Sequence, residues 1–459
     1  MHPNGIIAVF LALLTVIVSF TEDSRTRWAS IGLVLAVVLC IKVNAGLLLV
    51  LAIVFSISTR LPYLRKRRRL GIVMSAACAV PALLLVRSNV WLLLLTLLSI
   101  CFLGVALHRL APMSAVQGQR CLQWFGGALI GGLVIATACA WLVGSPPDVL
   151  WRALAIRPLG LEDAFSIPFA IPGTAVLAAL TSVFILAATA RGQQGHTAGV
   201  RIAIGGLGSG LLIALGPALV LPLSWVSLLK ERVSGIRGWE LPALATWFLL
   251  TVFPVAGSQV ALASILFVPV LLQMLAGGLR DIVVPQQFAT RPLFARILAV
   301  ALILASATLM IWSSTEPIRK AGSAYESREP LVAGDASGVR LTPDEAKILR
   351  DNAQWVRENC DTFYSFPGLN TYYVLTSLPV PGSATATTWW ALLDDAEQQK
   401  VIADMEQAQS PCFLRFNALT NFWLQGRPVP SSPLLDYLTS NYTPVQQFNS
   451  VELLQRKGR

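Results

Sequence analysis

The chain has 459 residues, of which 55% are hydrophobic and only 13% are charged. Soluble domains carry about 25% charged residues, so this composition excludes a single water-soluble globule and favours a protein whose natural solvent is lipid. The net charge of +11 does not indicate a nucleic-acid partner, because the basic residues are not spread over one soluble face. Six of them stand in one short segment: Arg60, Arg65, Lys66, Arg67, Arg68 and Arg69.

Apolar stretches separated by short polar breaks predict a helical membrane body over residues 1–314. The first stretch, 4–20, has no basic residues before it and no cleavage site after it, so it predicts a spanning helix rather than a signal peptide. The second, 29–58, is interrupted at 42–46 and predicts two short helices. The remaining stretches are 70–87, 89–108, 122–143, 171–190, 201–228, 241–256, 259–278 and 294–314.

Charge sets the expected topology. The basic run at 60–69 lies between two apolar stretches and predicts a cytoplasmic loop, with lipid head-group binding as a further role. The stretch 201–228 is either one kinked span or a tight pair. The tight pair keeps the basic loops in the cytoplasm, gives about twelve membrane helices, several of them short, and puts the C-terminal part outside. We therefore expect a multi-pass protein of the inner (plasma) membrane with an extracytoplasmic C-terminal domain.

Near residue 313 the sequence becomes polar and predicts a linker at 315–341 and an extracytoplasmic α/β domain at 342–459. Alternating helices and strands favour a largely parallel sheet. The expected elements are a helix from 342 to about 359, a strand at 361–366, a strand or helical turn at 371–376, a helix at 394–409, a strand at 411–416, a helix at 432–442 and a last strand at 445–453.

Of the seven cysteines, only Cys360 and Cys412 lie in the predicted soluble domain. They are either a disulfide, which requires an oxidising compartment, or two unrelated buried thiols. The other five lie in or beside apolar stretches, where we expect them to pack as small apolar residues. The three histidines form no ligand pattern with cysteines or carboxylates, so no metal site is predicted.

Ionisable residues at membrane depth usually face a cavity or a partner. Lys42, with Asn44, stands at the break between two short helices, where its charge could hold a lipid phosphate or pyrophosphate. The alternative is a lysine that extends to the interface and marks a helix end. Arg87 at an outer helix end is either a second phosphate contact or an interface anchor.

The predicted outer loop at 144–170 is either a structural anchor or one wall of an outward-facing site. Its Arg152 and Arg157 could contact a lipid phosphate. Sugar transfer would also need a carboxylate base near the outer surface. The candidates in this loop, each of which also has a purely structural reading, are Asp148, Glu162 and Asp163.

Three short motifs occur along the chain: the lysine-bearing break at 42–46, the turn Phe253-Pro254 followed by Gln259, and the tail with Pro367-Gly368-Leu369-Asn370. Together they resemble the polytopic GT-C glycosyltransferases, the group that includes protein mannosyltransferase-like and lipid A aminoarabinose transferase-like enzymes. The resemblance implies a polyprenyl-phosphate-linked sugar as substrate and transfer at the outer face. It also implies that Pro254 and Gln259 form an outward turn.

The chain departs from these relatives where they carry a catalytic carboxylate, in the first outer loop, since no acidic pair stands at an equivalent place. It resembles their C-terminal two-thirds, and so predicts a truncated enzyme, a half that needs a second membrane chain, or a non-catalytic relative. A divalent cation is expected only if the protein is catalytic. The alternative function is a non-enzymatic membrane subunit whose extracytoplasmic domain binds a partner in envelope assembly or secretion.

Overall fold

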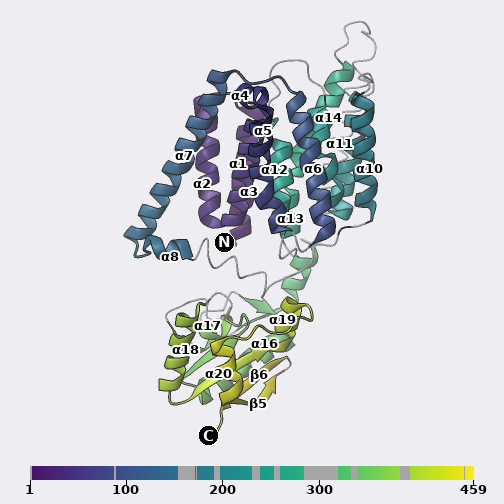
Figure 1. Ribbon diagram of the computed structural model, residues 1–459. Coiled ribbons are helices and arrows are strands. Elements are labelled where there is room, and N and C mark those ends of the chain that lie inside the picture. The colour runs from purple at the N-terminus through teal and green to yellow at the C-terminus, as the bar shows by residue number, and fades with distance from the viewer. Residues whose placement is uncertain are drawn as a thin grey trace. The chain divides into compact units, whose positions relative to one another are not determined.

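The computed structural model describes residues 3–86, 89–152, 171, 173–190, 197–229, 238–252, 259–283, 319–331, 339–382, 393–448 and 450–458. These residues form two compact units, the first ending at residue 283 and the second beginning at residue 319. The first unit is a bundle of helices, whereas the second combines helices with strands (Figure 1).

The helices of the first unit follow the apolar stretches. They are α1 (Pro3–Phe20), α2 (Arg25–Ile41), α3 (Val43–Arg60), α4 (Pro62–Lys66), α5 (Arg68–Leu85), α6 (Val90–Arg109), α7 (Ala115–Leu142), α8 (Pro147–Trp151), α10 (Thr174–Ala190), α11 (Thr197–Leu215), α12 (Leu241–Leu249), α13 (Gln259–Ser264) and α14 (Phe267–Val283), with the 3-10 helices η4 (Pro217–Leu219), η5 (Leu221–Leu228) and η6 (Leu250–Val252). The predicted break at Lys42 is confirmed, because this residue ends α2 and precedes α3. The predicted span at 294–314 lies outside the described residues.

The stretch 201–228 does not form one continuous helix, since α11 ends at Leu215 and the 3-10 helices η4 and η5 follow. The chain reverses at Gly216, whose φ of +82° is a conformation that glycine adopts without strain. The returning arm is η5, which packs against α6, α10, α12 and α14. Trp225 of η5 lies against Phe102 of α6, with ring centroids 5.9 Å apart. This arm is a 3-10 helix rather than an α-helix.

Among the described residues, four helices are long and apolar enough to cross a bilayer: Val43–Arg60, Val90–Arg109, Ala115–Leu142 and Gln259–Leu279. Large apolar side chains also lie on the surface of the bundle. Leu142 of α7 is 84% exposed and Phe184 of α10 is 75% exposed. Apolar surface of this extent is a liability in water but is suited to lipid, so the first unit is that of a membrane protein. The expected count of about twelve spans stays a prediction.

The second unit contains a four-stranded sheet in the order β3-β4-β6-β5. Its strands are β3 (Thr362–Phe366), β4 (Pro411–Phe416), β5 (Tyr442–Phe448) and β6 (Val451–Arg456). Only β3 and β4 are parallel, and the other two pairings are antiparallel. The prediction of a largely parallel sheet is therefore wrong, as is that of one last strand at 445–453. A hairpin with a turn at Ser450 replaces that strand, and a hairpin needs no helical crossover.

Helices cover this sheet. They are α16 (Pro343–Asn359), α17 (Thr371–Thr376), α18 (Asp395–Gln407), α19 (Asn417–Leu424) and α20 (Pro433–Asn441). Val356 of α16 and Leu375 of α17 share one buried cluster with Phe363 of β3, while α18 packs against α20. Two features were not predicted: α19, and secondary structure within the expected linker. There residues 319–326 are helical, and β1 (Glu329–Pro330) pairs with β2 (Arg340–Leu341).

The structure joins Cys360 and Cys412 in a disulfide, with Cα atoms 5.7 Å apart. Cys360 lies two residues before the start of β3, and Cys412 lies on β4 opposite Phe363. The parallel pairing of the two strands therefore brings together cysteines that are 52 positions apart. Of the two alternatives that the sequence left open, the structure contains the disulfide rather than two separate thiols.

Thr342 caps α16 and supports the first testable prediction. Its hydroxyl accepts from the Glu345 N–H, and the Glu345 carboxylate accepts from the Thr342 N–H. We expect Thr342→Ala to lower the free energy of unfolding of this domain by about 1 kcal/mol, measured by hydrogen exchange of the α16 amides in the full chain. Thr443→Ala, at an exposed position on β5, is the control. Equal exchange in both variants would contradict the cap.

The cap also predicts a pH dependence. Hydrogen bonds from the Thr342 N–H, and then from its hydroxyl, lower the pKa of the Glu345 carboxyl below its usual value. A carboxyl with a lowered pKa in the folded state stabilises that state above its unfolded pKa, and the stabilisation is lost as the pH falls through the folded value. The difference in stability between wild type and Glu345→Ala should therefore shrink in acid, whereas Thr342→Ala keeps the N–H that is the main cause of the shift.

Candidate functional site

The break between α2 and α3 lies beside the start of α13. The Lys42 ammonium donates a hydrogen bond to Gln259 Oε1 at 2.5 Å, although the two residues are 217 positions apart. The sequence placed them in separate motifs, the broken helix and the outward turn. Folding therefore brings two of the predicted site residues into direct contact.

The helix breaks at Lys42 because the backbone of this residue is extended, with φ of −154° and ψ of 98°. Its N–H donates to the Val38 carbonyl and closes α2, while its own carbonyl accepts from the Gly46 N–H and opens α3. A Cβ on Gly46 would lie 2.6 Å from the backbone of Leu39. Only glycine therefore lets α3 begin this close to the end of α2, and the Lys42 side chain is held half-buried at the junction.

The positive charge of the Lys42 ammonium can bind an anionic ligand. A lysine carries three N–H donors, and the bond to Gln259 uses one of them. Among the described residues, no carboxylate forms an ion pair with Lys42. A partly buried ammonium without a carboxylate partner is suited to bind an anion, and lysine binds phosphate as a compact point charge.

The other predicted site residues that the structure describes do not join this pair. Asn44 turns its Oδ1 onto the N–H of Ala45, at 2.9 Å, and so acts locally at the start of α3. Asp148 lies in the first turn of α8, and Arg152 follows that helix; both are exposed. In the described part of the chain neither forms a hydrogen bond or ion pair with Lys42. The remaining candidates, which lie outside the described residues, are Arg87, Arg157, Glu162, Asp163 and Pro254.

Potential metal ligands do not cluster in the part of the chain that the structure describes. No group of three or more His, Cys, Asp or Glu side chains there could hold a metal ion. The bond between Lys42 and Gln259 is consequently the polar feature from which we argue binding at this end of the bundle.

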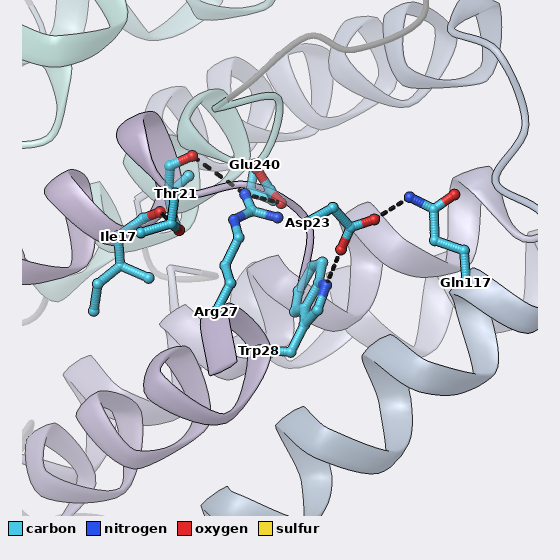
Figure 2. Close-up of polar contacts among 8 residues, drawn as sticks. Ile17, Thr21, Asp23, Arg27, Trp28, Gln117 and Glu240 are labelled. Carbon is cyan, nitrogen blue, oxygen red and sulfur yellow. Dashed lines mark hydrogen bonds and ion pairs between the residues drawn. The ribbon is translucent and has the colours of Figure 1, made fainter. Parts of the chain in front are cut away.

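The structure adds a buried ion pair that the sequence did not predict. Arg27 Nη2 lies 2.7 Å from Glu240 Oε1, and the two side chains are only 4% and 0% exposed. The same Arg27 nitrogen donates to the Val18 carbonyl at 3.2 Å. Figure 2 shows the pair at the start of α2, where Arg27 extends toward Glu240. From the sequence, both residues read as ordinary charges that flank apolar stretches.

Aromatic and polar side chains enclose this ion pair. The Arg27 guanidinium lies 5.0 Å from the Trp28 ring centroid, and the Arg60 guanidinium lies 4.4 Å from that of Trp239. The Trp28 indole N–H in turn donates to Asp23 at 2.6 Å (Figure 2). A tryptophan directly beside each member of the pair was the available sequence signal, because a tryptophan face attracts a cation.

Two arginines of the basic run also act structurally at this end. Arg60 donates to the carbonyl of Ala111, and Arg65 donates to those of Leu107 and Leu110. Their cationic side chains thus satisfy carbonyls at and just beyond the end of α6, where a positive charge is favourable. Part of the charge that suggested a cytoplasmic loop therefore fixes the helix ends in place.

Comparisons of the chain with family models, with curated proteins and with solved structures find no significant match.

Proposed function

We propose that this protein is a GT-C-like membrane protein that binds the phosphate of a polyprenyl-phosphate-linked sugar at Lys42. The hydrogen bond from Lys42 to Gln259 carries the proposal. It orients an ammonium at a helix break, and that ammonium keeps two further N–H donors for the oxygens of a phosphate. The exposed apolar side chains of the neighbouring helices suit the polyprenyl chain, which is itself a hydrocarbon.

We place this site at the extracytoplasmic face. Lys42 precedes α3 and Arg60 ends it, and 18 residues of helix separate the two ends by about 27 Å, close to the thickness of the hydrocarbon core. The end with the basic run belongs in the cytoplasm by the positive-inside rule, so Lys42 belongs outside. The disulfide in the second unit supports the same topology, because disulfides persist in oxidising compartments.

The proposal concerns binding rather than transfer. Sugar transfer also requires a base that deprotonates the acceptor hydroxyl. Asp148 is the described candidate from the outer loop, and it is exposed on α8 without a link to Lys42. A base for transfer would therefore come from outside the described residues or from a second chain.

Replacement of Lys42 tests the proposal. We expect wild-type protein in lipid nanodiscs to bind a polyprenyl phosphate more tightly than the uncharged polyprenol of the same length. Lys42→Met should weaken phosphate binding by about tenfold or more, because a hydrogen bond to a charged group contributes roughly 1.5–3 kcal/mol. Binding is measured by isothermal titration calorimetry, and Gln259→Leu should give a smaller loss because it removes only the orienting acceptor.

Lys66→Met is the matched control, since it removes an equal charge from an exposed position at the other end of α3. This variant should bind the polyprenyl phosphate as wild type does. Equal affinity of wild type for the phosphate and the alcohol, or equal loss in Lys42→Met and Lys66→Met, would refute the site.

A further inference from the structure

Two polar pairs join the same two parts of the chain at opposite ends. Arg27 stands in the first turn of α2 and Lys42 follows its last residue. Their partners, Glu240 and Gln259, precede α12 and begin α13. Fifteen positions (27 to 42) separate the two basic residues, which corresponds to about 22 Å along a helix. The buried ion pair and the proposed phosphate site thus lie at the two ends of one helix.

Helix α3 lies between these two parts. It packs against α2 and also against α12, and Phe55 of α3 meets Trp247 of α12 with ring centroids 4.7 Å apart. Buried apolar side chains of α2 and α3 include Leu35, Leu49 and Ile53. Apolar contacts are non-directional, whereas a charged hydrogen bond specifies geometry. Among the described residues, the two polar pairs are side-chain hydrogen bonds that join α2 and its end to the α12–α13 segment.

We propose that the Arg27–Glu240 ion pair positions Lys42 against Gln259 across the membrane. Arg27 and Glu240 are positioning residues that set how far α2 extends along its axis relative to the α12–α13 segment. The ligand part of this inference rests on the proposed function, but the geometric part does not. With Glu240 neutral, the buried Arg27 charge would be drawn toward the head groups. That movement would shift the rigid α2 and carry Lys42 away from Gln259.

Two polar atoms of the Arg27–Glu240 pair are buried without a further hydrogen bond, so the contact between the two residues matters for their stability in the bundle. Arg27 Nε and Glu240 Oε2 are buried and have no hydrogen-bond partner among the described residues. Arg27 donates the side-chain hydrogen bond that Glu240 accepts, while the Arg60 charge also acts on the Glu240 carboxylate. Loss of the Arg27 contact therefore removes the hydrogen-bonded link between α2 and the segment that precedes α12.

Chemical cross-linking tests the geometry without any ligand. Lys42→Cys and Gln259→Cys are introduced together, and the exposed free cysteines Cys40, Cys101 and Cys139 are replaced by serine. A short bifunctional thiol reagent is applied in membranes, and the linked peptides are quantified by mass spectrometry. A second pair, Gly208→Cys with Leu271→Cys, reports on the contact between α11 and α14, which involves neither α2 nor α12.

Two changes to the ion pair are then compared. Glu240→Gln should reduce cross-linking at 42–259 several-fold and leave 208–271 unchanged. Arg27→Met with Glu240→Leu should do the same, although it leaves no unpaired charge and should restore much of the lost stability. If both variants cross-link at 42–259 as much as wild type does, the positioning role is overturned. It is also overturned if cross-linking falls equally at 42–259 and 208–271, because general destabilisation of the bundle would have that effect.

The lipid measurement separates this inference from the proposed function. In chains that retain Lys42 and Gln259, the Arg27→Met, Glu240→Leu variant should lose about as much affinity for a polyprenyl phosphate as Gln259→Leu does, because both keep the Lys42 ammonium and remove only its contact with Gln259. If wild type binds no polyprenyl phosphate but cross-linking responds as described, the positioning role stands and the proposed function fails. If wild type binds the lipid and cross-linking does not respond, the proposed function stands and the positioning role fails.

Discussion

Glu240→Ala is expected to lower the free energy of unfolding of the membrane body by about 3–5 kcal/mol, the range found when one partner of a buried ion pair is removed. The reason is the environment of Arg27, which is 4% exposed. Without Glu240, the remaining hydrogen bond of Arg27 among the described residues is to the neutral Val18 carbonyl at 3.2 Å, so a full positive charge would stay buried without its ion-pair partner. Denaturation of purified protein in detergent, followed by tryptophan fluorescence, measures the loss.

Two further variants decide the cause of that loss. The double change Arg27→Met, Glu240→Leu should be far less destabilising than Glu240→Ala alone, because it leaves neither charge behind and apolar replacements of buried pairs are often tolerated. Asp148→Ala removes a carboxylate that is exposed on α8 and should change stability by no more than roughly 0.5 kcal/mol. If Glu240→Ala and Asp148→Ala behave alike, the ion pair is not a structural element of the bundle.

The disulfide between Cys360 and Cys412 should raise the free energy of unfolding of the second unit by about as much as the ion pair contributes to the membrane body. Cys360 and Cys412 are 52 positions apart, and the loop-entropy relation for a loop of this size gives about 4 kcal/mol at 25 °C. We expect Cys412→Ser in the full chain to expose the second unit to limited proteolysis at a lower urea concentration. Reductant should do the same to wild type and should have no further effect on the variant.

Cys139→Ser is the matched control for this prediction. Cys139 is a free, exposed cysteine of α7, so its replacement removes a thiol without removing a cross-link. Its proteolysis profile should match that of wild type, with and without reductant. A wild-type profile that does not respond to reductant would show that the bond contributes nothing measurable to the stability of the domain.

Local signals predicted several elements of the second unit correctly. The predicted helices from 342 and from 394 are confirmed as α16 and α18, and each begins with a capping box, Thr342 with Glu345 and Asp394 with Glu397. Such capping boxes lie within four residues of sequence, so no distant contact is needed to recognise them. The predicted strand at 411–416 is likewise confirmed as β4.

The same local signals could not predict which strands pair with one another in the sheet. The run at 445–453 alternates well enough to read as one strand, yet it folds back at Ser450 and pairs with itself in β5 and β6. Which neighbour a strand chooses depends on which apolar faces meet when the whole domain packs. The sheet order was therefore decided by tertiary contacts.

In the candidate site, too, some features could be predicted from the sequence and others only from the tertiary structure. Sequence alone located the membrane body and the helix break at Lys42, because hydrophobic length, glycine, proline and charge act over a few neighbouring residues. Only the tertiary structure placed Lys42 against Gln259 and Arg27 against Glu240. These contacts join residues more than 200 positions apart, and such distant partners become neighbours only after the helices between them have packed.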